Sequence, residues 1–419
     1  MGQNTITPTM ARMLKAFNFT LYGSIAVYST YFSLYLKNLG MTPASIGALL
    51  AGGPVVAIFS NPFWAYWADR KYGNRRILLF TLTGAFLLMQ VVFASRQEAW
   101  IYAGLLAFFL FQSPLFTQSN SLVLNVIDGT GYKFGAFRLW GSLGWAIVAA
   151  AAGPVIGRIG IDKLWIAVDV MMLIALAFAY LLPKEEKLPS GAGSSSRTAV
   201  AGYRLPSAPA VGIWRNRQFV FLLALGVLIS VPNAFNSTFV GLYIQDLGGS
   251  PQIVGWSIFA TAILEAPVYM LLDRYLTGSK RTMFALLSCV SLLYSARWLL
   301  MSGADQALAV VWIQLLHCVT FGVYYYIGTQ LTNRLVPPER RSTGQALYGL
   351  SWGGVSGFIA GMAGGWLFGE LGAPALYKAS AALTLAGAAG FLLLLLGGIS
   401  AYEEDRHGVD RQSANDKKG

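Results

Sequence analysis

Long apolar runs are the feature that most restricts what this chain can fold into. Runs of roughly 18 to 25 apolar residues recur from residue 16 to residue 401, and each is long enough to cross about 30 Å of hydrocarbon as a helix. Inside a bilayer only helices and closed barrels satisfy their own backbone polar groups. The alternating ten-residue strands of a barrel are not seen. We therefore predict an all-α membrane protein.

The apolar runs predict twelve transmembrane helices, an even number that places both termini on the same side. Short polar segments separate them, and the predicted ends are expected to be accurate to a few residues. The predicted spans are 16–37, 44–67, 76–95, 99–124, 134–158, 163–182, 216–244, 251–276, 281–301, 305–333, 343–370 and 374–401.

Charge supports the same conclusion and gives an orientation. Only 11% of the residues are charged, whereas about a quarter are charged in a soluble domain. The net charge of +12 lies in short loops, as in membrane proteins whose basic residues stay in the cytoplasm, so we exclude a nucleic-acid partner. With a cytoplasmic N-terminus, the Lys and Arg residues expected outside are Lys37, Arg96, Arg158, Lys163 and Lys378. We predict a protein of the cell (inner) membrane with both termini cytoplasmic.

The predicted spans fall into two halves. The longest polar stretch, 183–214, is rich in Gly and Ser and is predicted to be a cytoplasmic linker. It separates a six-helix bundle at 1–182 from a second six-helix bundle at 215–401, followed by a charged tail at 402–419 that is expected to be disordered.

The two halves also resemble each other in sequence. Gly47 of the second span corresponds to Gly255 of the eighth, and the fifth and eleventh spans share glycines at a constant spacing: Gly141 and Gly153 match Gly353 and Gly365. Such pseudo-symmetric bundles place a substrate site at the membrane midplane, between the repeats.

Charges inside the spans are costly and therefore indicate function. We place four ionisable residues there, Arg138, Glu265, Arg297 and His317. Arg138 lies at the start of span 5, where its guanidinium offers five donors for hydroxyls or a carboxylate, and Trp145 lies two turns away and can stack on a ring. An alternative is that Arg138 anchors the helix at the cytoplasmic boundary.

The loop after span 2 carries a recognisable signature. Its sequence, Ala68-Asp-Arg-Lys-Tyr-Gly-Asn-Arg-Arg76, resembles the loop signature of the major facilitator superfamily, with Ala65 where glycine is usual. Asp69 can face the N-terminus of another helix while Arg70 and Arg75 hold the cytoplasmic face, which would make a gating latch. A solvated turn that obeys the positive-inside rule is the alternative.

The likeness extends over nearly the whole chain. Span 5, and the twenty-residue spacing of Arg297 and His317 in spans 9 and 10, resemble the lactose permease, nucleoside:proton symporter and phenylpropionate permease group. The resemblance implies a major facilitator fold, a sugar-binding role for Arg138 and Trp145, and a proton-coupling role for Arg297 and His317. Where the lactose permeases have acids or lysines, this chain has Asn120, Asn233, Asn236, Gln314 and Thr320.

Because Thr320 is neutral, Glu265 in span 8 is the predicted proton carrier. A carboxyl group that changes its exposure and its partner can load and release a proton. Two alternatives stay open: Glu265 permanently paired with Arg297, and His317 as a neutral hydrogen-bonding residue.

We expect a secondary active transporter that moves a small organic solute by proton symport, with a proton-driven exporter as the alternative. The export hypothesis rests on the small-residue run from Ala149 to Gly157, which resembles an antiporter motif. No phosphate-binding loop, nucleophile signature or Cys/His metal cluster occurs, so we expect no enzyme activity, no cofactor and no metal. The expected partners are the solute, a proton and the lipid bilayer, and the protein is expected to be a monomer. Predicted substrate-binding residues are Arg138, Trp145, Asn120, Asn233, Asn236 and Gln314.

Overall fold

The chain folds into helices throughout the part that its computed structural model describes, residues 7–127, 130–182, 213–263, 265–276 and 279–415. The first half contains α1 (Pro8–Asn38), α2 (Pro43–Trp67), η1 (Ala68–Tyr72), α3 (Asn74–Ala94), α4 (Glu98–Gln112), α5 (Leu115–Ile127), α6 (Gly135–Ile159), η2 (Ile161–Lys163) and α7 (Leu164–Leu181). The second half contains α8 (Arg217–Asp246), α9 (Pro251–Ala262), α10 (Glu265–Tyr275), α11 (Lys280–Ser302), α12 (Ala307–Gln314), α13 (Leu316–Leu335), η4 (Pro338–Arg340), α14 (Arg341–Gly349), η5 (Leu350–Val355) and α15 (Ser356–Asn415).

These helices agree with the twelve predicted spans. Ten described stretches are long and apolar enough to cross a membrane, and one of them, Thr343–Leu396, covers two predicted spans. The backbone breaks within it at Gly372, whose φ of 77° is easily adopted by a residue without a side chain. The remaining span is α1, which is less apolar than the others. It can contain more polar residues because neighbouring helices, rather than lipid, surround most of its length.

Some spans are interrupted where the sequence suggested continuous helices. Span 4 divides into α4 and α5 at Ser113 and Pro114, since proline has no N–H to continue the helical ladder. Span 10 divides into α12 and α13 at Leu315, and span 11 contains the π-helical segment η5. In span 8, α9 and α10 flank residue 264, which lies outside the described residues. π-Helical segments such as η5 often occur at functional sites.

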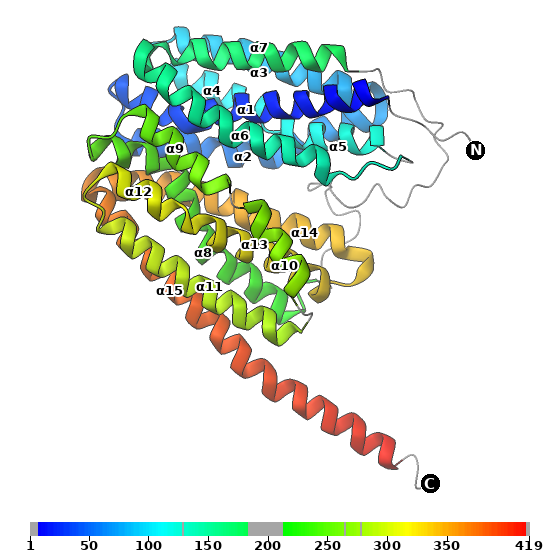
Figure 1. Cartoon of the computed structure of the whole chain (residues 1–419). Coiled ribbons are helices and arrows are strands. Elements are labelled where there is room, and N and C mark those ends of the chain that lie inside the picture. The colour runs from blue at the N-terminus through cyan, green and yellow to red at the C-terminus, as the bar shows by residue number, and fades with distance from the viewer. Residues whose placement is uncertain (1–6, 128–129, 183–212, 264, 277–278, 416–419) are drawn as a thin grey trace.

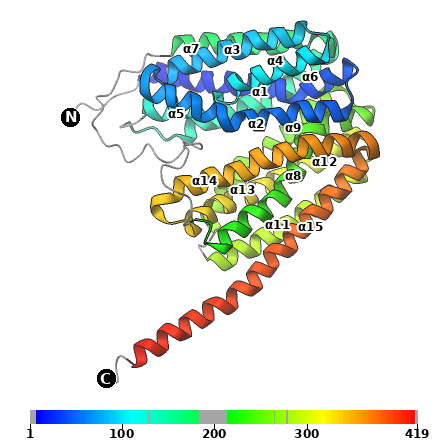
Figure 2. The ribbon, with the colours of Figure 1, turned by 180° about the vertical axis from the view of Figure 1, so that it is seen from behind.

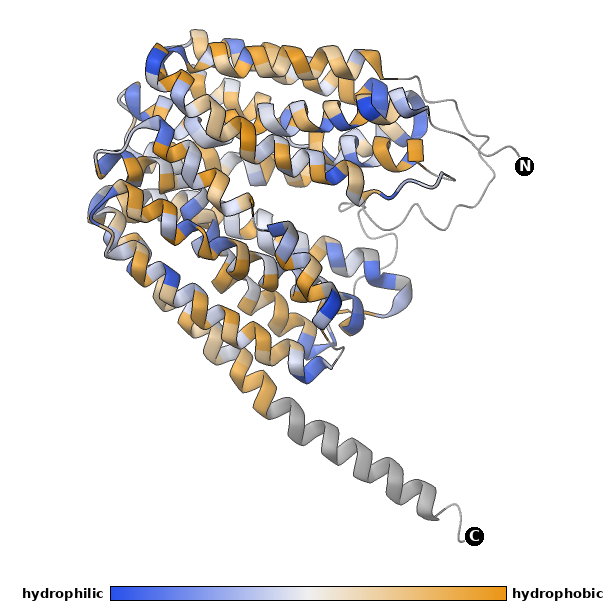
Figure 3. Cartoon of the chain, viewed as in Figure 1, coloured by the Kyte–Doolittle hydropathy of each residue, from blue (hydrophilic) through white to orange (hydrophobic). Residues whose placement is uncertain are grey.

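Helices α1–α7 form one bundle and α8–α15 the other (Figure 1). The bundles meet at the end where α1 joins α2 and α8 joins α9, and they splay apart towards the end that carries the N-terminus (Figures 1 and 2). Apolar residues dominate the outward helix faces, and hydrophilic residues gather at the helix ends (Figure 3). Large apolar side chains such as Phe59 and Leu393, 71% and 69% exposed, fit a surface that contacts lipid.

The tail differs from the prediction. Instead of being disordered from Tyr402, the chain continues as α15 through Asn415 (Figure 1). No proline follows Pro374, and the tail mixes acidic and basic residues, so nothing in its sequence stops the helix. Nearly all of the predicted linker, residues 183–212, lies outside the described residues.

At the closed end, the bundles touch through backbone. A Cβ atom on Gly47 of α2 would lie 2.2 Å from the carbonyl oxygen of Gly361 on α15. At the matching place in the other pair of helices, a Cβ atom on Gly255 of α9 would lie 2.6 Å from the carbonyl oxygen of Ala149 on α6. Only glycine permits these approaches, so both interfaces depend on small residues.

One turn further along each pair of helices, glycine again packs against the backbone of the other bundle. Gly153 of α6 packs against Pro251 at the start of α9, and Gly365 of α15 packs against Pro43 at the start of α2. These are the glycines whose spacing suggested duplicated halves. The internal repeat therefore appears as two equivalent helix-to-helix contacts between the bundles.

Two polar contacts join the same end. Lys37 Nζ at the end of α1 lies 2.5 Å from Asp246 Oδ1 at the end of α8, and both side chains are partly exposed. Tyr31 Oη donates a hydrogen bond of 2.7 Å to the carbonyl oxygen of Ala149. A partly exposed ion pair contributes about 1 kcal/mol or less, so the backbone packing is the main closure.

We predict that Gly47→Leu holds this end open, because its side chain has no room beside Gly361. A cysteine introduced at Ser237, which lies between the bundles, should then react several-fold faster with an impermeant maleimide in right-side-out vesicles, in a Cys289→Ser background. Gly353→Leu is the control, since nothing lies within 4 Å of a Cβ atom there. Equal labelling of the two variants would contradict the closure.

Candidate functional site

The second bundle buries a guanidinium. Arg297 on α11 is fully buried, and its Nη1 donates to His317 Nδ1 at 3.1 Å and lies 3.5 Å from Thr320 Oγ1. Its Nη2 donates to Gln314 Oε1, and its Cζ lies 4.3 Å from the ring centroid of Trp298. Two neighbouring helices, α12 and α13, thus supply hydrogen-bond partners for one charge, which would otherwise be expensive in an apolar interior.

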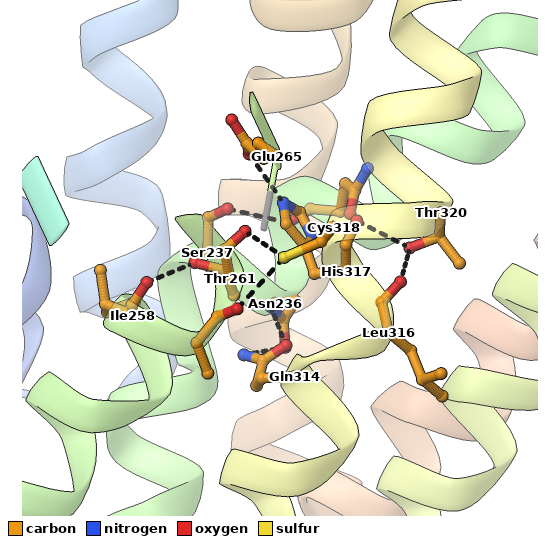
Figure 4. Close-up of polar contacts among 12 residues, drawn as sticks. Asn236, Ser237, Ile258, Thr261, Glu265, Gln314, Leu316, His317, Cys318 and Thr320 are labelled. Atoms are coloured by element: carbon orange, nitrogen blue, oxygen red, sulfur yellow. Dashed lines mark hydrogen bonds and ion pairs between the residues drawn. The ribbon is translucent and has the colours of Figure 1, made fainter. Parts of the chain in front are cut away.

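The arginine also sets the tautomer of the histidine. A guanidinium has only donors, so Nδ1 of His317 must accept, and the proton of the neutral imidazole lies on Nε2. That nitrogen is 3.9 Å from Glu265 Oε1 (Figure 4). His317 therefore links Arg297 on one side to Glu265 on the other, and the predicted proton-coupling residues form one connected group.

The predicted amide residues of this half extend the network. Asn236 on α8 and Gln314 on α12 exchange amide contacts of 3.4 Å (Figure 4), and Tyr377 Oη donates to Asn236 Oδ1 at 3.1 Å. Asn233 Nδ2 donates to Tyr294 Oη at 2.7 Å. All three predicted amide residues are buried, so in this conformation they hold the helices around Arg297.

A second group forms in the first bundle. The guanidinium carbon of Arg138 on α6 lies 4.6 Å from the ring centroid of Tyr22 on α1, and its Nη1 is 3.4 Å from Ser142 Oγ. Tyr22 Oη donates to Asn120 Oδ1 at 3.3 Å. Arg138 is exposed, so most of its donors remain available. A cation over an aromatic face with free donors suits recognition of a polar ligand.

Trp145 belongs to the same group through an aromatic side chain that the sequence did not single out. Phe116 on α5 packs between Tyr22 and Trp145, with ring centroids 4.5 Å and 6.4 Å away. Because Tyr22 also contacts Arg138 and Asn120, three predicted substrate-binding residues converge on this pair of rings. Tyr22 was missed because aromatic residues are common in membrane helices and most serve packing.

The two groups face each other across the bundle interface. The positive charge of Arg138 acts on the carboxyl group of Glu265 and on the phenol groups of Tyr269 and Tyr325, all in the second bundle. The structure therefore brings the intramembrane charges named from the sequence into two facing sets, Arg138 on one side and Glu265, His317 and Arg297 on the other.

Asp169 is an intramembrane acid that the sequence analysis did not identify. Asp169 lies within the apolar span of α7, where its Oδ1 accepts a hydrogen bond of 2.6 Å from Gln90 Nε2 on α3. The statement that the spans contain four ionisable residues was thus wrong, although an acid inside an apolar run was a readable signal. The contact joins two helices of the first bundle.

The loop after α2 has a different geometry from a simple turn. Residues Ala68–Tyr72 form the π-helical segment η1, and Arg70 lies over the Tyr66 ring at 5.0 Å. Arg75 Nη2 donates at 2.5 Å to the carbonyl oxygen of Tyr180, at the C-terminus of α7, where the helix dipole favours a cation. Arg75 thus ties α3 to α7 within the first bundle, and the latch role of Asp69, Arg70 and Arg75 stays a prediction.

A cavity of about 360 Å³ lies between the first bundle and α8. Its lining comes from α1, α2, the junction of α4 and α5, and α8, and includes Tyr28, Gln112, Phe116 and Ser237. Phe116 connects this cavity to the Arg138 group, and Ser237 is the neighbour of Asn236 in the second bundle. The cavity is therefore lined by both bundles, whereas Arg138 and Glu265 do not line it.

We predict that Arg297→Lys destabilises the second bundle by on the order of 2–4 kcal/mol, because an ammonium cannot serve Gln314, His317 and Thr320 together. Thermal or denaturant unfolding of the purified protein in detergent measures the change. Arg217→Lys, at the exposed start of α8, is the matched control and should leave the unfolding midpoint in place. Equal stability of the two variants would show that the network is not a structural requirement.

Comparison with known proteins agrees with this architecture. The family model described as the MFS_1 like family matches residues 11–379. The chain is 28% identical to the maltose permease of Geobacillus stearothermophilus over 392 residues, covering 93% of this chain and 95% of that protein. It is 27% identical to the probable 3-phenylpropionic acid transporter of Escherichia coli (strain K12) over 313 residues, covering 73% and 77%.

Solved structures show the same fold. The crystal structure of a mutant of the nucleoside transporter NupG superposes with a TM-score of 0.78 at 15% identity, covering 92% of this chain and 99% of that one. The two bundles, the span order and the family match over most of the chain lead to one conclusion: this chain belongs to the MFS_1 like family of major facilitator transporters.

Proposed function

We propose that the protein is a secondary active transporter that imports a small organic solute, a sugar, nucleoside or aromatic acid, together with a proton. The observation that carries this proposal is the position of Glu265, which lies beside His317 in its own bundle and within the field of Arg138 in the other. The names of its relatives, a maltose permease and a probable 3-phenylpropionic acid transporter, support the solute class.

Glu265 is placed to couple proton and solute. As a carboxylate it needs a cationic or N–H partner in this apolar setting, and Arg138 and His317 Nε2 are the partners at hand. As a neutral acid it needs neither. A solute that engages the guanidinium of Arg138 draws that charge away from Glu265 and so favours the protonated acid. Proton binding and solute binding then support each other.

Alternating access follows from the arrangement of the bundles. The end with Lys37 and Asp246 is closed by backbone packing, while the bundles splay at the opposite end (Figure 1). Arg12, Arg75 and Arg217 lie at the splayed end, so the positive-inside rule supports a cytoplasmic opening here, with both termini in the cytoplasm of a monomeric inner-membrane protein. Rocking about the equivalent α2–α15 and α6–α9 contacts would expose the site outside.

Proton-driven export is the alternative. Its sequence basis, the run from Ala149 to Gly157, packs directly against α9, with Gly153 beside Pro251 and the Ala149 carbonyl beside Gly255. Close helix packing accounts for those small residues without an antiport role. Import therefore remains the preferred direction, and uptake into vesicles under opposite proton gradients distinguishes the two.

We predict that Arg138→Ala abolishes solute binding, because the exposed guanidinium over the Tyr22 ring offers hydrogen-bond donors that alanine lacks. Binding to purified protein is the measurement, with thermal unfolding as a check on folding. Arg158→Ala, on the same helix at its opposite end, should bind as the wild type does. If Arg138→Ala binds with unchanged affinity, Arg138 is not part of the site.

We predict that Glu265→Gln keeps solute exchange but loses uphill accumulation, since an amide cannot carry a proton. Exchange and accumulation are measured side by side in proteoliposomes with an imposed proton gradient. Glu98→Gln, in the exposed first turn of α4, should retain both activities. Normal accumulation by Glu265→Gln would remove Glu265 as the proton carrier.

A further inference from the structure

Two interrupted spans of the second bundle lie against each other where they are interrupted. Helix α9 packs against α12 and α10 packs against α13, so the end of α9 lies beside the break at Leu315. The end of α9 has a chemical cause, because Pro267 has no N–H to offer the carbonyl oxygen of Ile263, four residues earlier. Glu265, the proposed proton carrier, is the first residue of α10 and therefore lies directly after this interruption.

A buried thiol of the neighbouring span contacts the end of α9. Cys318 is fully buried in the first turn of α13, and its Sγ lies 3.2 Å from the carbonyl oxygens of both Ala260 and Thr261 (Figure 4). These carbonyl groups belong to the last turn of α9, and the last four carbonyl groups of a helix have no N–H partner within it. The thiol has one proton, which it can donate to either oxygen and so stabilise the helix end.

Helix α13 also contacts the segment on the other side of the interruption. His317, the residue before Cys318, has its Nε2 3.9 Å from Glu265 Oε1. Further along α13, a Cβ atom on Gly322 would lie 3.1 Å from Val268 Cγ1, so α10 packs closely on this helix. One helix therefore contacts both segments of span 8, α9 through the thiol and α10 through the imidazole and the glycine.

The position of the end of α9 affects the carboxyl group of Glu265. Only Ile263 and Leu264 separate α9 from Glu265 in the sequence, so a shift of the helix end is transmitted to the acid. The acid lies beside His317 and within the field of Arg138, and a displacement of about 1 Å is enough to disturb contacts of this kind. A buried cysteine that only packs would not need its sulfur at two carbonyl oxygens.

We propose that Cys318 is a positioning residue for Glu265. Its thiol fixes the end of α9, and the end of α9 in turn holds the carboxyl group between His317 and Arg138. Cys318 acts through the backbone of α9 and itself carries neither proton nor solute. This inference rests on the proposed proton coupling through Glu265 and adds a residue on which that coupling depends.

The test compares Cys318→Ala with Cys318→Ser in the full-length protein in proteoliposomes. Exchange, and accumulation under an imposed proton gradient, are measured with a probe that the wild type accumulates: maltose, uridine or 3-phenylpropionate. Cys318→Ala removes the donor and should lower accumulation by on the order of 2- to 10-fold, the effect of one lost hydrogen bond, while exchange stays near the wild-type rate. Cys318→Ser keeps a donor at the same place and should restore most of the accumulation.

Cys289→Ala is the matched control, because Cys289 on α11 is exposed, and it should retain both activities. Thermal unfolding of each variant measures its folding. A merely structural thiol would lower exchange and accumulation together in Cys318→Ala, and that result, or the absence of rescue by serine, would overturn the inference.

Failure of this inference differs from failure of the proposed function. If Glu265→Gln loses accumulation but Cys318→Ala accumulates as the wild type does, Glu265 still couples the proton and Cys318 does not position it. If Glu265→Gln itself accumulates normally, both the proposed coupling through Glu265 and the positioning role of Cys318 are wrong.

Discussion

A guanidinium buried in an apolar bundle must be surrounded by partners, and the second half of the chain is organised around that requirement. Removing a charge from water costs several kcal/mol even after relaxation, so Arg297 is tolerated only with oxygen and nitrogen acceptors in place. Gln314, His317 and Thr320 supply them from α12 and α13. Asn236 then connects Gln314 to α8. The charge of Arg297 thereby fixes the relative positions of four helices, α8, α11, α12 and α13.

The need for partners also applies to Glu265, the acid that faces Arg138 across the bundle interface. His317 accepts a hydrogen bond from Arg297, and its Nε2 lies 3.9 Å from Glu265 Oε1, so one imidazole lies between the buried arginine and the acid. Arg138 approaches that acid from the other bundle. A charge relation that crosses the bundle interface changes whenever the bundles move, which is the reason for proposing Glu265 as the coupling residue.

The end of the protein where the bundles meet is closed by backbone packing rather than by buried charge. Gly47 and Gly255 let helices touch backbone to backbone, and equivalent contacts occur in both pairs of crossing helices. Interfaces of small residues have little side-chain interdigitation to break, so they suit helices that must separate and rejoin. The ion pair of Lys37 and Asp246 adds a polar contact at the rim.

The sequence alone determined the helical class, the span order, the duplicated halves and the charges that had to meet, because bilayer thickness and the cost of buried charge act on local composition. Only the tertiary structure decided which side chains touch. Tyr22 and Phe116 join the Arg138 group, yet neither differs in sequence from an aromatic residue that merely packs. Contacts between helices depend on rotation and approach, which hydropathy does not encode.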